Sequence, residues 1–64
     1  MNTYLVTYKS TNGTTKRVLI FDKNSLLACE RVALEPDFQV FDTPKGKPCF
    51  EIIYNDEIIC VGEW

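Results

Sequence analysis

The stretch TYLVTYKSTNGTTKRVLIF, residues 3 to 21, decides the fold of this chain. Its first part, Thr3 to Lys9, alternates between two faces, with Val6 and both tyrosines on one of them, which is the period of a half-buried strand. Asn12-Gly13 between β-branched runs is the strongest short-range hairpin signal, because both residues tolerate a positive φ. A second strand is then expected over residues 15 to 21, so this stretch predicts a β-hairpin.

One helix is expected after the hairpin. Asp22 to Ser25 offers several N-cap side chains, and good helix formers predominate from Leu26 to Leu34 until Pro36 forbids continuation. At 100° per residue Arg31 and Glu35 point away from an apolar stripe. The stripe consists of Leu26, Cys29, Val32 and Ala33. Leu27 and Leu34 lie on its far flank, where they either tuck under a loop or form an exposed apolar edge.

The rest of the chain reads as three strands. They are predicted at Phe38 to Phe41, Cys49 to Tyr54 and Glu57 to Gly62, with a long loop between the first two and a tight turn at Asn55-Asp56. The expected fold is a single α+β domain over residues 1–64, with one helix on a five-stranded, mainly antiparallel sheet in the order ββαβββ. Apolar side chains on both strand faces exceed what one helix covers. This surplus indicates a curled sheet, a dimer or a partner site.

Composition excludes most catalytic chemistry. The 64 residues contain no His, so neither a His general base nor a Cys-His nucleophile is available, and the three glycines lack nucleotide-binding spacing. Three widely spaced cysteines without a C-x-x-C pair favour buried reduced thiols over a disulfide framework or a metal site. We therefore expect no enzyme activity, metal or cofactor. No apolar run is long enough for a membrane span, and Met1 leads directly into strand-like residues, so we expect a complete cytoplasmic reading frame.

The net charge of −2 is unevenly distributed: residues 1–23 carry +3, and residues 24–64 carry −5. Lys9, Lys16 and Arg17 surround the first hairpin, and Lys45 and Lys47 lie in the long loop. These side chains are candidates for gripping phosphates or an acidic protein surface, or else they guard strand edges and keep the chain soluble.

Trp64 is a candidate protein-binding anchor, because Trp and Tyr dominate hot spots, or alternatively a cap on a small core.

The helix segment Ser25-Leu26-Leu27-Ala28-Cys29-Glu30-Arg31-Val32-Ala33 resembles a family of small phage-encoded type I-F anti-CRISPR proteins, which share the ββαβββ order. Ser25, Leu26, Arg31 and Ala33 look like matches, and Val32 is a near match, whereas Glu30 stands where the family carries a base. The resemblance implies binding to backbone subunits of a crRNA-guided surveillance complex by protein–protein contact. It also implies that Arg31, Lys16 and Arg17 lie near nucleic acid.

Three functions remain open from the sequence. The first is a phage or mobile-element inhibitor that occupies a host protein or ribonucleoprotein complex in the bacterial cytoplasm. The second is a small nucleic-acid-binding module that uses the basic hairpin and the Lys45 to Lys47 loop. The third is a homodimeric structural domain that pairs through strand edges. The surplus apolar surface and the charge split favour a protein partner over nucleic acid.

Overall fold

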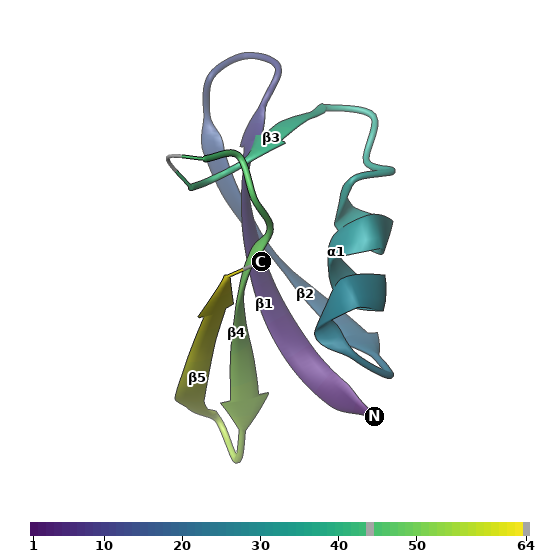
Figure 1. Ribbon diagram of the computed structural model, residues 1–64, viewed down its shortest axis with the longest axis vertical. Coiled ribbons are helices and arrows are strands. Elements are labelled where there is room, and N and C mark those ends of the chain that lie inside the picture. Colours follow the sequence, from purple (N-terminus) through teal and green to yellow (C-terminus); the bar gives the residue numbers. More distant parts are fainter. Residues whose placement is uncertain (44, 64) are drawn as a thin grey trace.

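A computed structural model describes residues 1–43 and 45–63 of the chain and confirms the predicted order of elements (Figure 1). The elements are β1 (Asn2–Ser10), β2 (Thr15–Asp22), α1 (Ser25–Val32), β3 (Phe38–Phe41), β4 (Cys49–Tyr54) and β5 (Glu57–Glu63). Two long hairpins, β1–β2 and β4–β5, diverge at one end of the sheet, and α1 lies beside β1 and β2. The α+β class is confirmed.

The sheet is built around β1. The strand order is β2-β1-β4-β5, and β3 pairs with β1 beyond the end of β4. All four pairings are antiparallel, so Tyr4 lies between Ile20 of β2 and Ile52 of β4, while Tyr8 faces Phe41 of β3. The sequence predicted the antiparallel sheet, and the structure adds that β1 is its central strand.

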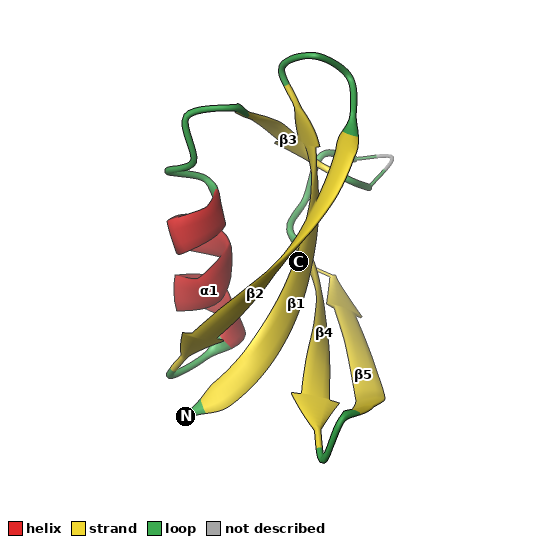
Figure 2. Ribbon diagram, turned by 180° about the vertical axis from the view of Figure 1, so that it is seen from behind, coloured by secondary structure: helices red, strands yellow, loops and turns green. Residues whose placement is uncertain are grey.

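The core lies between α1 and one face of β1. Alternation along β1 turns Tyr4, Val6 and Tyr8 toward the helix, and all three are buried. The helix contributes Ala28, Cys29 and Val32 to the core, and these are likewise buried. Phe50 packs against Tyr4 in an edge-to-face arrangement, with the ring centroids 5.8 Å apart. Figure 2 shows that α1 covers only this side of the sheet, so the opposite side has no helix over it.

Two details of the predicted helix are wrong. The helix ends at Val32 instead of Leu34, because the N–H groups of Leu34 and Glu35 bond to carbonyls three residues back instead of four. The buried face is also rotated: Leu26 is 49% exposed and Ala33 is exposed, whereas Ala28 is fully buried. A small side chain at position 28 allows the helix to approach the sheet closely, and this decides the rotation. Leu27 and Leu34 form the exposed apolar edge that was one of the two alternatives.

The two hairpin turns differ in geometry. Among the described non-glycine residues only Asn55 and Asp56 have positive φ, 51° and 63°, which is the signature of a type I′ turn between β4 and β5. At the first hairpin Gly13 alone has positive φ, and its N–H bonds to the carbonyl of Ser10 across 2.9 Å. The Asn12-Gly13 hairpin is therefore confirmed, and residues 11 to 14 form its connection.

No helix in the described part of the chain is long and apolar enough to cross a membrane.

Candidate binding surface

The side of the sheet away from α1, called the open face below, carries the residues that alternate with the core. Cross-strand register arranges them in rows. One row runs from Phe21 of β2 through Thr3 to Ile53 and Ile58. The next row runs from Leu19 through Leu5 to Glu51 and Val61, and Arg17 lies beside Thr7 in a third row. Because neighbours across a ladder lie on one face, these rows form a continuous surface.

An apolar patch fills the first two rows of the open face. Four of its members are largely exposed: Leu19 is 63% exposed, Phe21 59%, Ile58 55% and Val61 66%. Leu5 and Ile53 lie between them and are half-buried. The apolar patch is defined as Leu5, Leu19, Phe21, Ile53, Ile58 and Val61. Curling of the sheet therefore does not shield these side chains, and the dimer and the partner site remain as explanations of the surplus.

An ion pair borders the apolar patch. Arg17 Nη2 donates to Glu51 Oε1 across 2.9 Å, so the pair bridges β2 and β4 over the central strand. The Glu51 side chain is only 19% exposed, and its second oxygen, Oε2, is buried without a hydrogen-bond partner among the described residues. The Arg17 side chain is about half exposed. The pair places a partly desolvated carboxylate beside the apolar patch.

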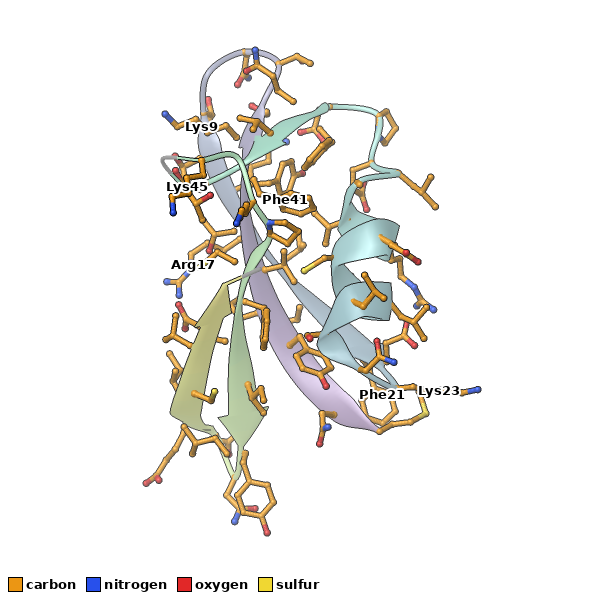
Figure 3. All side chains as sticks on the ribbon, viewed as in Figure 1. Lys9, Arg17, Phe21, Lys23, Phe41 and Lys45 are labelled. Atoms are coloured by element: carbon orange, nitrogen blue, oxygen red, sulfur yellow. The ribbon has the colours of Figure 1, made fainter. Side chains whose placement is uncertain are left out.

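The basic side chains predicted to bind a partner divide between the two sides of the sheet. Figure 3 shows Lys9, Arg17 and Lys45 on the side away from α1, at the end near the first hairpin. Lys47 is exposed in the same loop as Lys45. Lys9, Lys45 and Lys47 make no ion pair among the described residues. The basic end of the open face thus consists of Lys9, Arg17 and Lys45.

Lys16 lies on the other side, where it is bound within the chain. It forms an ion pair with Asp37, and Asp37 Oδ1 also accepts a hydrogen bond from the Tyr8 hydroxyl across 3.0 Å. The hydrogen bond from Lys16 is the main cause that lowers the pKa of Asp37, and the same bond raises the pKa of Lys16. Burial, followed by the bond to Asp37, raises the pKa of Tyr8. This cluster joins the first hairpin to the segment before β3.

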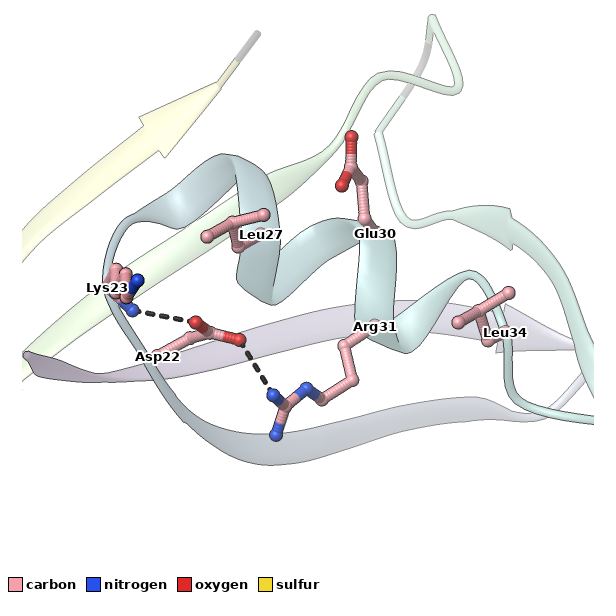
Figure 4. Close-up of a pocket in the computed structure, with 6 residues that line it drawn as sticks. All are labelled: Asp22, Lys23, Leu27, Glu30, Arg31 and Leu34. Atoms are coloured by element: carbon pink, nitrogen blue, oxygen red, sulfur yellow. Dashed lines mark hydrogen bonds and ion pairs between the residues drawn. The ribbon is translucent and has the colours of Figure 1, made fainter.

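Arg31 is paired as well. Its guanidinium lies 3.1 Å from Oδ2 of Asp22, whose other oxygen accepts the backbone N–H of Lys23 (Figure 4). Leu27 and Leu34 flank this pair in a shallow cleft on the outer side of α1. Of the seven predicted binding residues, Lys16, Arg17 and Arg31 therefore already have a carboxylate partner. Trp64 lies outside the described residues.

The three cysteines differ in exposure. Cys29 is buried, Cys49 is half-buried and Cys60 is exposed, so the expectation of buried thiols is wrong for Cys60. Burial raises the pKa of Cys29 to about 11, which keeps that thiol protonated and weakly nucleophilic at neutral pH. No cluster of three or more His, Cys, Asp or Glu side chains able to hold a metal ion occurs in residues 1–43 and 45–63.

The residues of the apolar patch were not among the predicted site residues, although a signal for them was present. Alternation along residues 15 to 21 places Leu19 and Phe21 on the face opposite Ile20. Those two side chains could have been assigned to the open face once the hairpin register was fixed. The contribution of Ile58 and Val61 required the pairing of β4 with β1, which no local pattern reveals.

No family model matches the chain, and no curated protein or solved structure matches it.

Proposed function

We propose that this protein is a non-catalytic binding protein whose open face docks on the surface of another protein. The observation that carries the proposal is the apolar patch, with four largely exposed members drawn from both β2 and β5. Contiguous apolar surface with a charged border is the anatomy of protein interfaces, and exposed patches of this kind mark interaction sites on soluble domains.

Energetics supports the same surface. Burial of apolar area is worth about 25 cal/mol per Å², so covering Leu19, Phe21, Ile58 and Val61 would contribute several kcal/mol to association. Phe21 supplies an aromatic anchor at one side of the patch. The basic end of the open face would then lie at the border of the interface, where charges steer encounter and set orientation.

Nucleic acid is a weaker candidate as the partner. Affinity for nucleic acid depends on cations that neutralise phosphates. Lys16 and Arg31 are paired to Asp37 and Asp22 on the helix side, and Arg17 is paired to Glu51. The lysines at positions 9, 45 and 47 remain, but they border an apolar patch and not a wholly cationic groove.

The more specific proposal is that the partner is a bacterial ribonucleoprotein defence complex, which the protein inhibits by occupying its surface in the host cytoplasm. The resemblance of residues 25 to 33 to a type I-F anti-CRISPR family supports it. The small size and the lack of His are consistent with inhibition by binding instead of chemistry.

A pull-down on variants tests the open face. Leu19→Asp introduces a carboxylate at an exposed position on the β2 side of the apolar patch, so it should leave folding intact and abolish capture of the partner from a bacterial lysate. Leu34→Asp is the matched control, because Leu34 is 83% exposed but lies beyond the end of α1. Capture that survives Leu19→Asp, or is lost equally with Leu34→Asp, would contradict the open face as the binding site.

A plaque assay tests the identity of the partner. Cells that carry an active type I-F defence system and express the protein should regain sensitivity to phage, and cells that express Leu19→Asp should remain resistant. Binding of the purified surveillance complex should follow the same pattern. If neither phage sensitivity nor binding changes, the defence complex is excluded. A dimer mass by sedimentation that Leu19→Asp converts to a monomer would instead identify a second copy as the occupant.

A further inference from the structure

The β5 strand is an unguarded edge of the sheet. Among residues 1–43 and 45–63, β5 pairs with β4 alone, so its other side presents backbone N–H and C=O groups that no described strand takes up. Natural edge strands are commonly protected by Lys, Pro or a covering element. The opposite edge, β2, contains Lys16 and Arg17 and lies beside α1, whereas β5 contains neither Lys, Arg nor Pro. Its one protective device is a bulge next to Ile58.

The exposed side chains of β5 make this edge apolar. Ile58, Ile59 and Val61 are all more than half exposed. Ile58 and Val61 also end the two rows of the apolar patch, because they pair with Ile53 and Glu51 of β4. A strand added beside β5 would therefore lengthen both rows and cover the apolar patch at its border. The edge and the open face form one continuous docking region.

Charge selects the chemistry of the added strand. The β4–β5 hairpin, residues 49 to 63, contains Glu51, Asp56, Glu57 and Glu63 and no basic residue. A second copy adding its own β5 here would bring the same set of carboxylates and no cation, so it would not supply complementary charge. A strand that carries Lys or Arg has the complementary charge.

We propose that the free edge of β5 is a strand-addition site for an extended segment of the partner protein in which apolar residues alternate with Lys or Arg. Main-chain hydrogen bonds to β5 provide affinity, and the alternating side chains provide specificity. The apolar residues pack beside Ile58 and Val61, and the basic residues lie near Glu57 and Asp56. This inference rests on the proposed function, since it names the segment of the partner that the docking region takes.

The probe is a seven-residue peptide of alternating Lys and Val with blocked ends. Amide hydrogen exchange of the protein, followed by NMR, should slow at residues 57 to 63 when the peptide is added, and the effect should weaken with salt. A Glu/Val peptide should not produce it, because its charge matches that of the hairpin. A Lys/Val peptide methylated on every backbone nitrogen should not produce it either, because it has no backbone N–H on either edge to donate to β5.

Variants localise the effect. Glu57→Lys should weaken binding of the Lys/Val peptide by about fivefold, the upper end for one opposite-charge cross-strand pair. Glu30→Lys is the matched control, because Glu30 is exposed on α1 away from β5, and it should bind as the native chain does. The inference is overturned if β5 exchange does not change at millimolar peptide, if the methylated peptide protects equally, or if Glu30→Lys weakens binding as much as Glu57→Lys.

The proposal of strand addition at β5 and the proposal of docking through the open face can be overturned separately. Leu19 lies on β2, at the opposite side of the sheet from β5, so Leu19→Asp should abolish capture of the whole partner and leave the peptide effect on β5 unchanged. If the peptide does not slow exchange at β5 but Leu19→Asp still abolishes capture of the partner, only strand addition is overturned. A peptide effect on β5 without Leu19-dependent capture would support strand addition and overturn docking through the open face.

Discussion

Asp37 connects more of the structure than any other single carboxylate among the described residues. Its two oxygens bind Lys16 of β2 and the hydroxyl of Tyr8 in β1, and its backbone carbonyl accepts the N–H of Thr11 in the hairpin loop across 2.8 Å. Tyr8 is only 2% exposed, so its hydroxyl needs a partner within the protein. One side chain thus satisfies a buried donor and fixes the first hairpin to the segment that leads into β3.

Asp37 should make stability depend on pH. Its pKa is lowered in the folded protein, chiefly by the hydrogen bond from Lys16, so its contribution is fully present above the unfolded pKa of about 4 and is lost as the pH falls through the folded pKa. We expect Asp37→Asn to be less stable than the native chain at neutral pH. The difference should shrink toward about pH 3, as measured by urea unfolding at both pH values. If the two proteins differ equally in free energy of unfolding at both pH values, the charge of Asp37 does not contribute to stability.

Gly62 is required by a close approach and not by its backbone angles. A Cβ at this position would lie 2.2 Å from Cζ of Phe50, because the ring packs flat over the glycine on the neighbouring strand. We expect Gly62→Ala to destabilise the domain by about 1–3 kcal/mol in urea unfolding, the usual cost of overpacking. The double variant Gly62→Ala/Phe50→Leu should show less than the sum of the two single losses. Additive losses would contradict the steric explanation.

At the scale of elements, α1 depends on its surroundings for stability. Its eight residues are too few to persist as an isolated helix. Asn24 supports its first turn, since Oδ1 accepts the N–H of Leu27 across 2.9 Å. The sheet supplies the rest through contact with Ala28, Cys29 and Val32.

Removing the N-cap should therefore lower the stability of the whole domain. We expect Asn24→Ala to cost about 1 kcal/mol, because it leaves an orphan backbone donor, and Asn24→Asp to retain stability because a carboxylate accepts the same bond. Thermal unfolding followed by circular dichroism measures both. A loss for Asn24→Asp as large as that for Asn24→Ala would show that the cap bond does not matter.

The elements were predictable where local patterns determine them. Alternation and turn residues located β3 and β4 at the observed bounds and the other strands within about one residue, which is closer than such patterns usually allow. The rotation of α1 was not predictable, because two turns of helix carry apolar residues on several sides and only contact with the sheet selects Ala28 over Leu26.

The candidate site was less predictable than the fold. Its basic residues were readable from the sequence, but the pairing of Arg17 with Glu51 joins residues that are 34 positions apart. The strand order has the same origin, since β1 pairs with β4 across the whole helix and β3. Non-local pairing therefore decides which charges are available and which apolar residues share the open face.

At the scale of the whole molecule, β1 is the strand on which cooperativity depends. It pairs with β2, β3 and β4, and its inner face packs against α1. Val6 lies at the centre of this arrangement, is fully buried, and has Val18 and Phe50 as its cross-strand neighbours. A change at this position reaches every layer of the structure.

Val6→Ala should weaken the entire domain at once. The lost burial costs about 1–3 kcal/mol, a large share of the few kcal/mol that stabilise a domain of this size. The helix circular-dichroism signal and the tyrosine fluorescence should change together in one transition, at a lower urea concentration than in the native chain. Leu19→Ala, at an exposed position, should leave the midpoint of that transition nearly unchanged. Loss of helix before the tyrosine environment changes would contradict a single cooperative unit.

The position of β1 between β2 and β4 also determines how the chain must assemble. The β1–β2 ladder forms between neighbours in sequence, but the β1–β4 ladder joins Thr3 to Ile53 and therefore needs the closure of a long segment. The β4–β5 hairpin, which residues 42 to 48 tether to the rest of the chain, therefore completes the sheet only when β4 pairs with β1. A chain divided within that tether is expected to recombine as a split protein, in which each half completes the sheet of the other.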